Sequence, residues 1–232
     1  MIRITKIQEL AKHKAAKVAV KLVKDRWIVG LGSGSTMNYA IIELATRIKK
    51  EKINILVVPS SYQTYLKAIE EKIPVTTLDE HPETDITLDG TDEVDEKKDL
   101  IKGGGAALTR EKIIASATKK YVIIADESKL VNKLGAKSPV PIEVLPFAYT
   151  LVVHKLKKYN NTTKLREGKG KVGPIITDNG NFIIDIFCET INNPTKLNRE
   201  LKDIPGVIET GLFIKMADIV YIGQHNGRVK IL

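Results

Sequence analysis

The sequence predicts an α/β protein with a layered, mostly parallel sheet and helices on both faces, plus a smaller α+β domain with an antiparallel sheet. Over the first 130 residues, short apolar runs typical of buried strands alternate with helix-length segments. Prolines at positions 139, 141 and 146 then interrupt this alternation. Further on, Asp178-Asn179-Gly180 separates two apolar runs, a pattern typical of a β-hairpin.

The predicted α/β domain begins with a lysine-rich amphipathic helix over residues 6–23, and a second helix is expected over 37–50. The expected parallel strands are short and apolar, and they cover residues 28–31, 53–58, 86–89 and 121–125. Short strands near the end of the chain, within 206–213, 219–223 and 229–232, are expected to return to this domain. The first domain is therefore predicted to comprise residues 1–132 and 205–232.

The smaller domain is predicted over residues 133–204. Its expected elements, in chain order, are a strand at 142–145, a helix at 148–159, a hairpin joining 175–176 to 182–184, and a helix near 194–201. Strands joined by a tight turn pair in an antiparallel manner, and this order therefore favours a small antiparallel sheet covered by helices.

Composition excludes several classes of protein. The 232 residues are 43% hydrophobic, and no apolar run approaches the length of a membrane span, nor does the N-terminus resemble a signal peptide. The single Cys188 cannot form an internal disulfide, and we expect a buried or half-buried thiol in a reducing cytosol. The four histidines are scattered, which argues against a metal site built from histidine and cysteine. The net charge of +9 accompanies only 5% aromatic residues and no nucleic-acid-binding motif, and therefore indicates a solvated lysine-rich surface.

The first candidate binding segment, residues 27–36, is an apolar strand that runs into glycines and hydroxyl side chains ahead of a helix. Backbone N–H groups at a helix N-terminus bind phosphate readily. No lysine stands where a Walker A loop requires one, and Ser35 occupies the third glycine position of a dinucleotide fingerprint. A phosphate monoester is therefore favoured over a nucleotide. The loop alone also fits an ordinary strand-to-helix turn.

The second candidate segment combines Asp89-Gly90-Thr91-Asp92-Glu93 with the run from Lys102 to Lys112, which contains three consecutive glycines. Carboxylates at the carboxyl end of a buried strand lie where open α/β sheets bind small molecules. Three glycines lose conformational entropy on folding and gain no packing, which indicates that the backbone itself is needed there. Acid, base and oxyanion partner in one segment predict proton-transfer chemistry on a small, oxygen-rich substrate.

Simpler roles also fit these residues. Glu111 near a helix start can complement the helix dipole. Asp89 and Asp92 can cap the following turn, or bind a metal together with Glu93 and Asp95. A calcium-binding loop of the helix–loop–helix type, however, requires glycine at its sixth position, and here glycine stands second.

Taken together, these segments resemble the A type of ribose-5-phosphate isomerase. The matching stretches, in family order, are 30–36, 89–93, 101–113, 125–129, 141–146, 177–181, 206–207 and 211–213. The run from Lys102 to Ile113 is highly specific, and the resemblance covers nearly the whole chain. Thr91 departs from the family, in which alanine is common, and adds a hydroxyl beside Asp92.

The resemblance implies a role for each matching residue. Glu111 would be the catalytic base, Asp89 and Asp92 would open the sugar ring and orient the substrate, and Lys102 would lie near the reacting oxygens. The implied substrate contacts are Ser33, Gly34, Ser35, Thr36, Gly90, Thr91, Gly103, Gly104, Gly105, Lys129 and a helix-one lysine, Lys12, for which Lys14 and Lys17 are alternatives. Lys102 and Glu111 stand nine positions apart, so their meeting depends on the glycine turn.

The expected function is therefore a cytoplasmic isomerase that interconverts ribose 5-phosphate and ribulose 5-phosphate in the pentose phosphate pathway, with no cofactor and no metal. The family implies a homodimer or homotetramer, with the smaller domain as the expected contact, and neither nucleic acid nor membrane as a partner. Two other functions remain open from sequence: a non-catalytic sugar-phosphate-sensing domain and a nucleic-acid-binding protein. An intact set of acid, base and lysine argues against the sensor, since a sensor needs no base.

Overall fold

The computed structural model describes residues 6–159, 162–168, 170 and 172–232. The chain forms two compact units. Unit 1 contains residues 1–91, 110–130 and 216–232, and unit 2 contains residues 92–109 and 131–215. This division differs from the predicted domains in three segments, because residues 92–109, 131–132 and 205–215 belong to unit 2.

Unit 1 is built on a six-stranded sheet with the strand order β13-β12-β6-β3-β1-β2. In chain order, its strands are β1 (Ile28–Leu31), β2 (Leu56–Pro59), β3 (Ile86–Asp89), β6 (Tyr121–Asp126), β12 (Ile219–Gly223) and β13 (Val229–Ile231). All neighbours are parallel except β12 and β13, which form an antiparallel pair. The four predicted parallel strands are present, and the predicted strand at 53–58 begins later, at Leu56.

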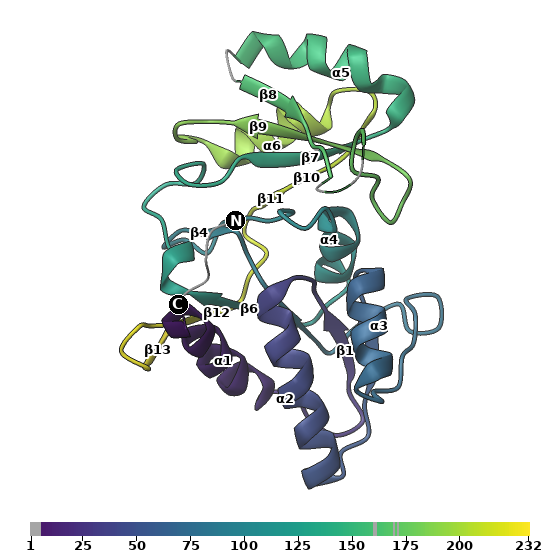
Figure 1. Cartoon of the computed structure of the whole chain (residues 1–232), viewed down its shortest axis with the longest axis vertical. Coiled ribbons are helices and arrows are strands. Elements are labelled where there is room, and N and C mark those ends of the chain that lie inside the picture. Colours follow the sequence, from purple (N-terminus) through teal and green to yellow (C-terminus); the bar gives the residue numbers. More distant parts are fainter. Residues whose placement is uncertain (1–5, 160–161, 169, 171) are drawn as a thin grey trace. The chain divides into compact units, whose positions relative to one another are not determined.

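One face of this sheet is covered by α1 (Lys6–Val20) and α2 (Ser35–Glu51), which lie side by side in Figure 1. Alternate residues of the strands, such as Val29 and Leu31 of β1, pack against alanines of α1 and the apolar side of α2 in one core cluster. Small alanines on α1 let this helix approach the sheet closely. The continuous burial of β3 and β6 is typical of strands covered on both faces.

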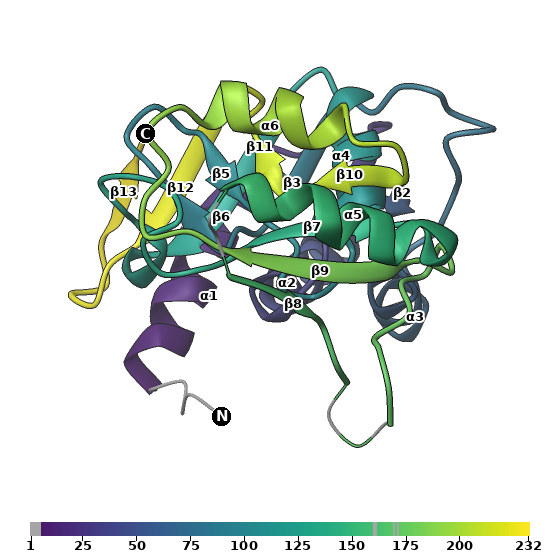
Figure 2. The same cartoon turned by 90° about the horizontal axis from the view of Figure 1, so that it is seen from above.

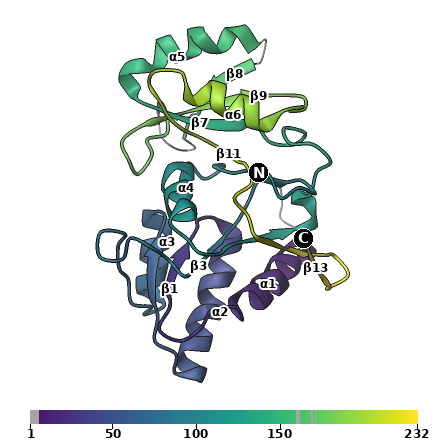
Figure 3. The ribbon, with the colours of Figure 1, turned by 180° about the vertical axis from the view of Figure 1, so that it is seen from behind.

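The other face of the sheet is the one opposite α1 and α2. Figure 3 shows the molecule from behind and labels the paired strands β1 and β3. Here Gly30 leaves room for Thr87 and for Ile114 of α4 (Leu108–Ser116): an added methyl group at Gly30 would lie 2.2 Å from Thr87 Oγ1 and 2.5 Å from Ile114 Cγ2. The missing side chain therefore brings α4 onto β1. Helices thus cover both faces, as predicted. A further helix, α3 (Tyr62–Glu70), is capped by the Ser61 hydroxyl, which accepts a hydrogen bond from the Thr64 amide.

Unit 2 contains two antiparallel sheets, with the orders β10-β7-β9-β8 and β11-β5-β4. The strands are β4 (Glu93–Val94), β5 (Leu100–Ile101), β7 (Val140–Val144), β8 (Thr162–Leu165), β9 (Phe182–Phe187), β10 (Val207–Thr210) and β11 (Leu212–Phe213). The helices α5 (Tyr149–Leu156) and α6 (Pro194–Lys202) lie over β7 and β9 (Figure 2) and share one core cluster with them.

The strand pairing of unit 2 explains why it extends beyond the predicted small domain. β11 pairs with β5, and β10 pairs with β7. The stretch 206–213 therefore joins unit 2 instead of returning to the first unit as predicted, whereas β12 and β13 do return to it. The predicted hairpin is present as a turn with Gly180 at φ +81° and a single bridge between Ile176 and Phe182. The main partner of β9 on that side is β8, which was not predicted.

Candidate active site

In unit 1, hydroxyl side chains join the loops that follow β1 and β2. Because β1 and β2 are parallel, their carboxyl ends meet at one edge of the sheet. The Ser33 hydroxyl donates to Ser61 Oγ at 2.7 Å and lies 2.8 Å from Ser60 Oγ, while the Thr64 hydroxyl donates to the Gly32 carbonyl at 2.8 Å. The Ser33 hydroxyl therefore holds the loop in shape, and its expected contact with phosphate stays a prediction.

The buried Asp89, at the end of β3, lies against Gly32. A methyl group on Gly32 would lie 1.7 Å from Asp89 Oδ1, and only glycine therefore leaves room for the carboxylate. Asp89 Oδ1 accepts from the Gly90 amide at 2.7 Å, and Oδ2 accepts from the Tyr121 hydroxyl at 2.8 Å. Burial, and then the negative charges of Asp89 and Glu111, raise the pKa of Tyr121 well above its usual value, which keeps the phenol protonated as a donor.

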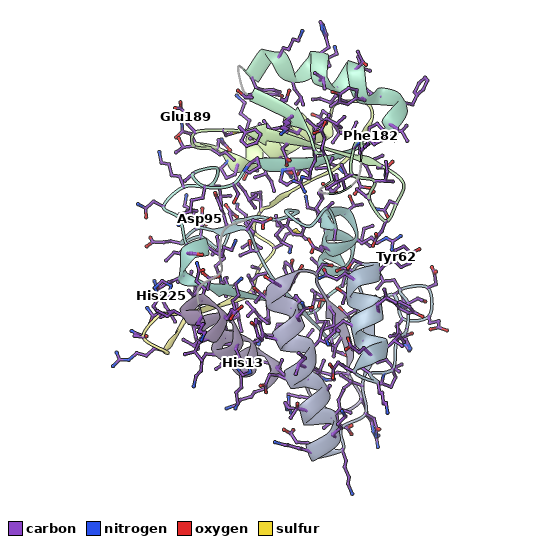
Figure 4. All side chains as sticks on the ribbon, in the orientation of Figure 1. His13, Tyr62, Asp95, Phe182, Glu189 and His225 are labelled. Carbon is purple, nitrogen blue, oxygen red and sulfur yellow. The ribbon has the colours of Figure 1, made fainter. Side chains whose placement is uncertain are left out.

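Glu111 stands in the first turn of α4 and is 5% exposed. Its Oε1 accepts a hydrogen bond from the Ser33 amide at 3.3 Å, although the two residues are 78 positions apart. The preceding residue, Arg110, lies over the ring of Tyr62 with its guanidinium carbon 5.4 Å from the ring centroid, and Tyr62 is labelled at the start of α3 in Figure 4. The fold of unit 1 thus places a buried carboxylate on the loop that follows β1.

The start of α2 combines a helix N-terminus with lysine. No side chain caps α2, and the first amides of a helix have no partner within it. Lys12 Nζ donates to Ser35 Oγ at 3.3 Å. Lys12 is 6% exposed, whereas Lys14 and Lys17 point to solvent, so Lys12 is the helix-one lysine at this place.

Charges around Lys12 indicate an anion site. Burial lowers the pKa of Lys12; nearby Asp126 raises it, and nearby Lys129, at the end of the short helix η1 (Glu127–Lys129), lowers it further. Two ammonium groups that repel each other are stabilised by an anion between or beside them. Together with the N-terminus of α2, they form a place suited to a phosphate group. Thr36 stands in the first turn of α2, and a methyl group on Gly90 would lie 3.9 Å from its Cβ.

Unit 2 carries the remaining predicted residues. Asp92 Oδ2 accepts a hydrogen bond from the Gly104 amide at 2.7 Å, and Gly103 adopts φ +105°, a conformation that favours glycine. Lys102 is 3% exposed, with its ammonium 5.4 Å from the centroid of the Phe213 ring. The triple-glycine turn is therefore tied to an acidic side chain, with a buried lysine next to it in the chain.

Among the residues that the structure describes, no group of three or more His, Cys, Asp or Glu side chains could hold a metal ion. In the same part of the chain, none of the helices combines the length and apolar character needed to cross a membrane.

Comparison with known proteins identifies the family. Residues 56–227 match the family model of ribose 5-phosphate isomerase A (phosphoriboisomerase A). The chain belongs to this family. It is 50% identical over 222 residues to the ribose-5-phosphate isomerase A of Pyrococcus abyssi, covering 95% of this chain and 96% of that protein. With the enzyme of Methanococcus aeolicus it shares 47% identity over 225 residues, which cover 97% and 95% of the two chains.

Solved structures of the ribose 5-phosphate isomerase A family have the same fold. The structure from Methanocaldococcus jannaschii superimposes with a TM-score of 0.93 at 45% identity, covering 97% of this chain and 99% of that one. A D-ribose-5-phosphate isomerase in complex with phospho-erythronic acid also gives a TM-score of 0.93, at 47% identity, covering 97% of this chain and 98% of the other.

Within this family member, each unit gathers part of the predicted set. Unit 1 contains Lys12, Ser33, Gly34, Ser35, Thr36, Asp89, Gly90, Thr91, Glu111 and Lys129, and unit 2 contains Asp92, Lys102, Gly103, Gly104 and Gly105. Sequence reasoning missed Tyr121, the donor to Asp89, because a tyrosine at the start of an apolar strand looks like a core residue. It also missed Ser60 and Ser61, although their position directly after a strand was a usable signal.

Proposed function

We propose that this protein interconverts D-ribose 5-phosphate and D-ribulose 5-phosphate by proton transfer through an enediolate. The observation that carries the proposal is the buried Glu111 carboxylate on the Ser33 amide, in the same unit as the anion-receptive start of α2. The relatives named ribose-5-phosphate isomerase A, similar over nearly their whole length, support the substrate. A carboxylate can act as the general base when it lies within reach of the substrate, and an anion site can fix the sugar phosphate beside it.

We assign the protons as follows. In the open-chain aldose, Glu111 removes the proton on C2, and the electron pair of that bond moves into the enediolate. Glu111 then delivers a proton to C1, while the proton of the C2 hydroxyl is transferred to the C1 oxygen, which gives the ketose. Lys102 and the amides of the Gly103–Gly105 turn would stabilise the negative oxygen of the intermediate. The reaction needs no hydride acceptor, metal or other cofactor.

The other residues hold and prepare the substrate in this proposal. The phosphate would be bound by Lys12, Lys129 and the segment Ser33–Thr36, where the helix N-terminus favours negative charge. Asp89 and Asp92 would assist ring opening and orient the sugar hydroxyls. Gly90 and Thr91 connect these two carboxylates, and their backbone would contact the sugar.

We further propose that the enzyme works in the cytoplasm, in the non-oxidative pentose phosphate pathway, as a homodimer or homotetramer. The single cysteine supports a reducing compartment. Exposed apolar side chains of unit 2 support it as the place of self-contact: Phe147 is 97% exposed and Leu151 is 46% exposed. Neither nucleic acid nor a membrane is a proposed partner. Light scattering of the wild type and of Phe147→Asp tests the self-contact.

The test of the proposed function is an isomerisation assay with Glu111→Gln as the decisive variant. The wild type should convert ribose 5-phosphate, with arabinose and allose phosphates as the specificity series. The amide keeps the shape of the side chain but cannot accept the carbon-bound proton, and kcat should fall by at least about 10²-fold. Binding of phospho-erythronic acid should change little.

Three results would contradict the proposal. A folded Glu111→Gln protein that isomerises within a few-fold of wild type would place the base elsewhere, with Asp89 and Asp92 next. A wild type that binds the sugar phosphate without converting it would be a sensor. Salt-dependent binding of DNA or RNA without isomerisation would indicate a nucleic-acid-binding protein.

A further inference from the structure

Arg166, which directly follows β8 in unit 2, contacts the backbone of the triple-glycine turn. Its Nη1 donates to the Gly103 carbonyl at 2.6 Å and to the Gly104 carbonyl at 3.2 Å. The arginine is 63 positions beyond Gly103 in the chain, and only the antiparallel sheet of unit 2 brings it there. The contact thus links a strand end to the turn that the proposed mechanism uses for oxyanion stabilisation.

The guanidinium is held in place from its other edge. Arg166 Nε donates to Asp185 Oδ2 at 2.8 Å, and Nη2 donates to Asp185 Oδ1. Asp185 lies on β9 opposite Lys164 of β8. The side chains of Arg166 and Asp185 are only 13% and 12% exposed. A two-point pair between a planar guanidinium and a carboxylate fixes the direction of the remaining N–H groups. Arg166 therefore approaches the glycine turn with a defined orientation.

This contact determines where the amides of the turn point. A trans peptide is planar, with its carbonyl and N–H on opposite sides. The Gly103 carbonyl accepts a hydrogen bond from Arg166. The N–H of the same peptide belongs to Gly104, and it accordingly points the other way and donates to Asp92 Oδ2 at 2.7 Å. The Gly104 carbonyl is also on Arg166, so the Gly105 N–H points away from the arginine. A methyl group on Gly105 would meet nothing within 4 Å, and the backbone there is open to a ligand.

We propose that Arg166, held by Asp185, is a positioning residue that fixes the Gly103–Gly105 turn so that the Gly105 amide is presented to the negative oxygen of the reacting sugar. The inference rests on the proposed isomerase function. Arg166 itself touches no reacting atom in this account. It sets two peptide planes, and the strained Ala106, at φ +62°, closes the turn by donating its amide to the Gly103 carbonyl at 3.0 Å.

The test compares Arg166→Ala with a matched control, Arg47→Ala. Arg47 of α2 makes the same kind of contacts: Nε and Nη2 pair with Glu51, and Nη1 donates to the Val20 and Val23 carbonyls. Each variant loses a two-point ion pair and the hydrogen bonds to two backbone carbonyls, but only Arg166 contacts the glycine turn. We expect Arg166→Ala to lower kcat by about 10- to 100-fold, the usual range for misplacing a binding group, with a smaller change in KM. Arg47→Ala should keep kcat within about twofold, because its contacts involve only α1, α2 and the segment between them.

Two further measurements separate positioning from folding. Free guanidinium should restore part of the kcat of Arg166→Ala, and Arg166→Lys should restore little because an ammonium lacks the planar fork. In glycine-labelled protein, the Gly105 amide resonance should shift on addition of phospho-erythronic acid to the wild type and should shift much less in Arg166→Ala. Asp185→Asn, a milder change, should lower kcat in the same direction if Arg166→Ala does not fold.

The inference is overturned if Arg166→Ala and Asp185→Asn both keep wild-type kcat, or if Arg47→Ala loses as much activity as Arg166→Ala. It would also be overturned if phospho-erythronic acid shifted the Gly105 amide resonance as much in Arg166→Ala as in the wild type. Failure of the proposed function has a different signature, since then the wild type itself would not isomerise ribose 5-phosphate.

Discussion

The loop after β1 and the turn at Gly103–Gly105 are both rich in glycine, yet different groups hold them. Hydroxyl side chains of neighbouring loops hold the first, and its Gly32 is required by the close approach of Asp89. Two charged side chains hold the second, Asp92 on a glycine amide and Arg166 on glycine carbonyls. The first loop is a packed element of the sheet edge, and the second is a turn whose peptide groups are individually oriented.

This difference matches two kinds of negative charge. A phosphate is charged throughout the reaction, and a helix N-terminus with Lys12 beside it is suited to such a constant charge. An enediolate oxygen becomes negative only during the reaction, and donors that are already fixed stabilise it without further reorganisation. The comparison teaches that glycine is needed in the first loop because a side chain would not fit, and in the second because the peptide groups must take particular orientations.

Gly32→Ala tests this contrast with the largest expected effect. The added methyl group has no room beside the Asp89 carboxylate, so the loop or Asp89 must move. Overpacking of this kind destabilises by about 1–3 kcal/mol, and a shift of about 1 Å in a reacting group lowers the rate about 10²-fold. The control Gly105→Ala meets open space and should unfold like the wild type in urea. Equal stability of the two variants would contradict the contrast.

Lys12→Ala tests the phosphate side of the comparison, with KM expected to rise about tenfold while kcat changes less. The pH dependence has a defined sign. Burial lowers the pKa of Lys12 from its usual 10.5, so the ammonium is lost at a lower pH than for an exposed lysine. The affinity for sugar phosphate should therefore fall as the pH rises toward the lowered pKa of Lys12. In Lys12→Arg the side chain stays charged over this pH range. If the KM of this variant still rose with pH, the titration would belong to another group.

Glu143→Gln should change stability and leave catalysis nearly intact. The buried Glu143 of β7 accepts hydrogen bonds from Thr109, Thr177, Asn179 and Asn181. A glutamine turns an NH2 group toward some of these donors, which should lower the free energy of unfolding by about 1–3 kcal/mol. The control Glu200→Gln concerns a partly exposed residue that has an ion pair with Lys196 at 3.9 Å, and it should change the free energy of unfolding by less than about 0.5 kcal/mol. A loss of kcat in Glu143→Gln beyond a few-fold would give this network a catalytic role.

Removal of metal should have the smallest effect, namely none. Proton transfer through an enediolate requires only an acid–base group and fixed donors. Exhaustive chelation, followed by assay without added nicotinamide, should leave kcat unchanged. Loss of turnover that a divalent ion restores would assign the acidic cluster from Asp89 to Asp95 to metal binding.

Much of unit 1 was predictable because its signals are local. Apolar runs and helical periodicity predict β1, β3, β6 and α2 from short windows of sequence. The extent of unit 2 was not predictable in the same way. β4, β5 and β11 have only two residues each, and β5 pairs both with the nearby β4 and with β11, where Ile101 lies opposite Leu212. No local pattern records such pairing.

The candidate site divides along the same line. Motif residues such as Asp89, Lys102 and Glu111 were named from sequence because they stand in a specific run. Tyr121 and Arg166 were missed, because each acts through a contact that the fold creates over 32 and 63 positions. The stretch 177–181 was noticed as a hairpin turn and for its resemblance to the family, but its contact with β7 was not predicted: three of its side chains donate hydrogen bonds to the buried Glu143.

The most direct test of the central claim follows the C2 proton of ribose 5-phosphate in D2O by NMR. If Glu111 carries this proton, the wild type should exchange it for deuterium while ribulose 5-phosphate forms, and Glu111→Gln should show neither exchange nor product on the same time scale. Retained binding of phospho-erythronic acid would show that the variant's site is intact. Exchange by Glu111→Gln at a rate close to that of the wild type would contradict the account.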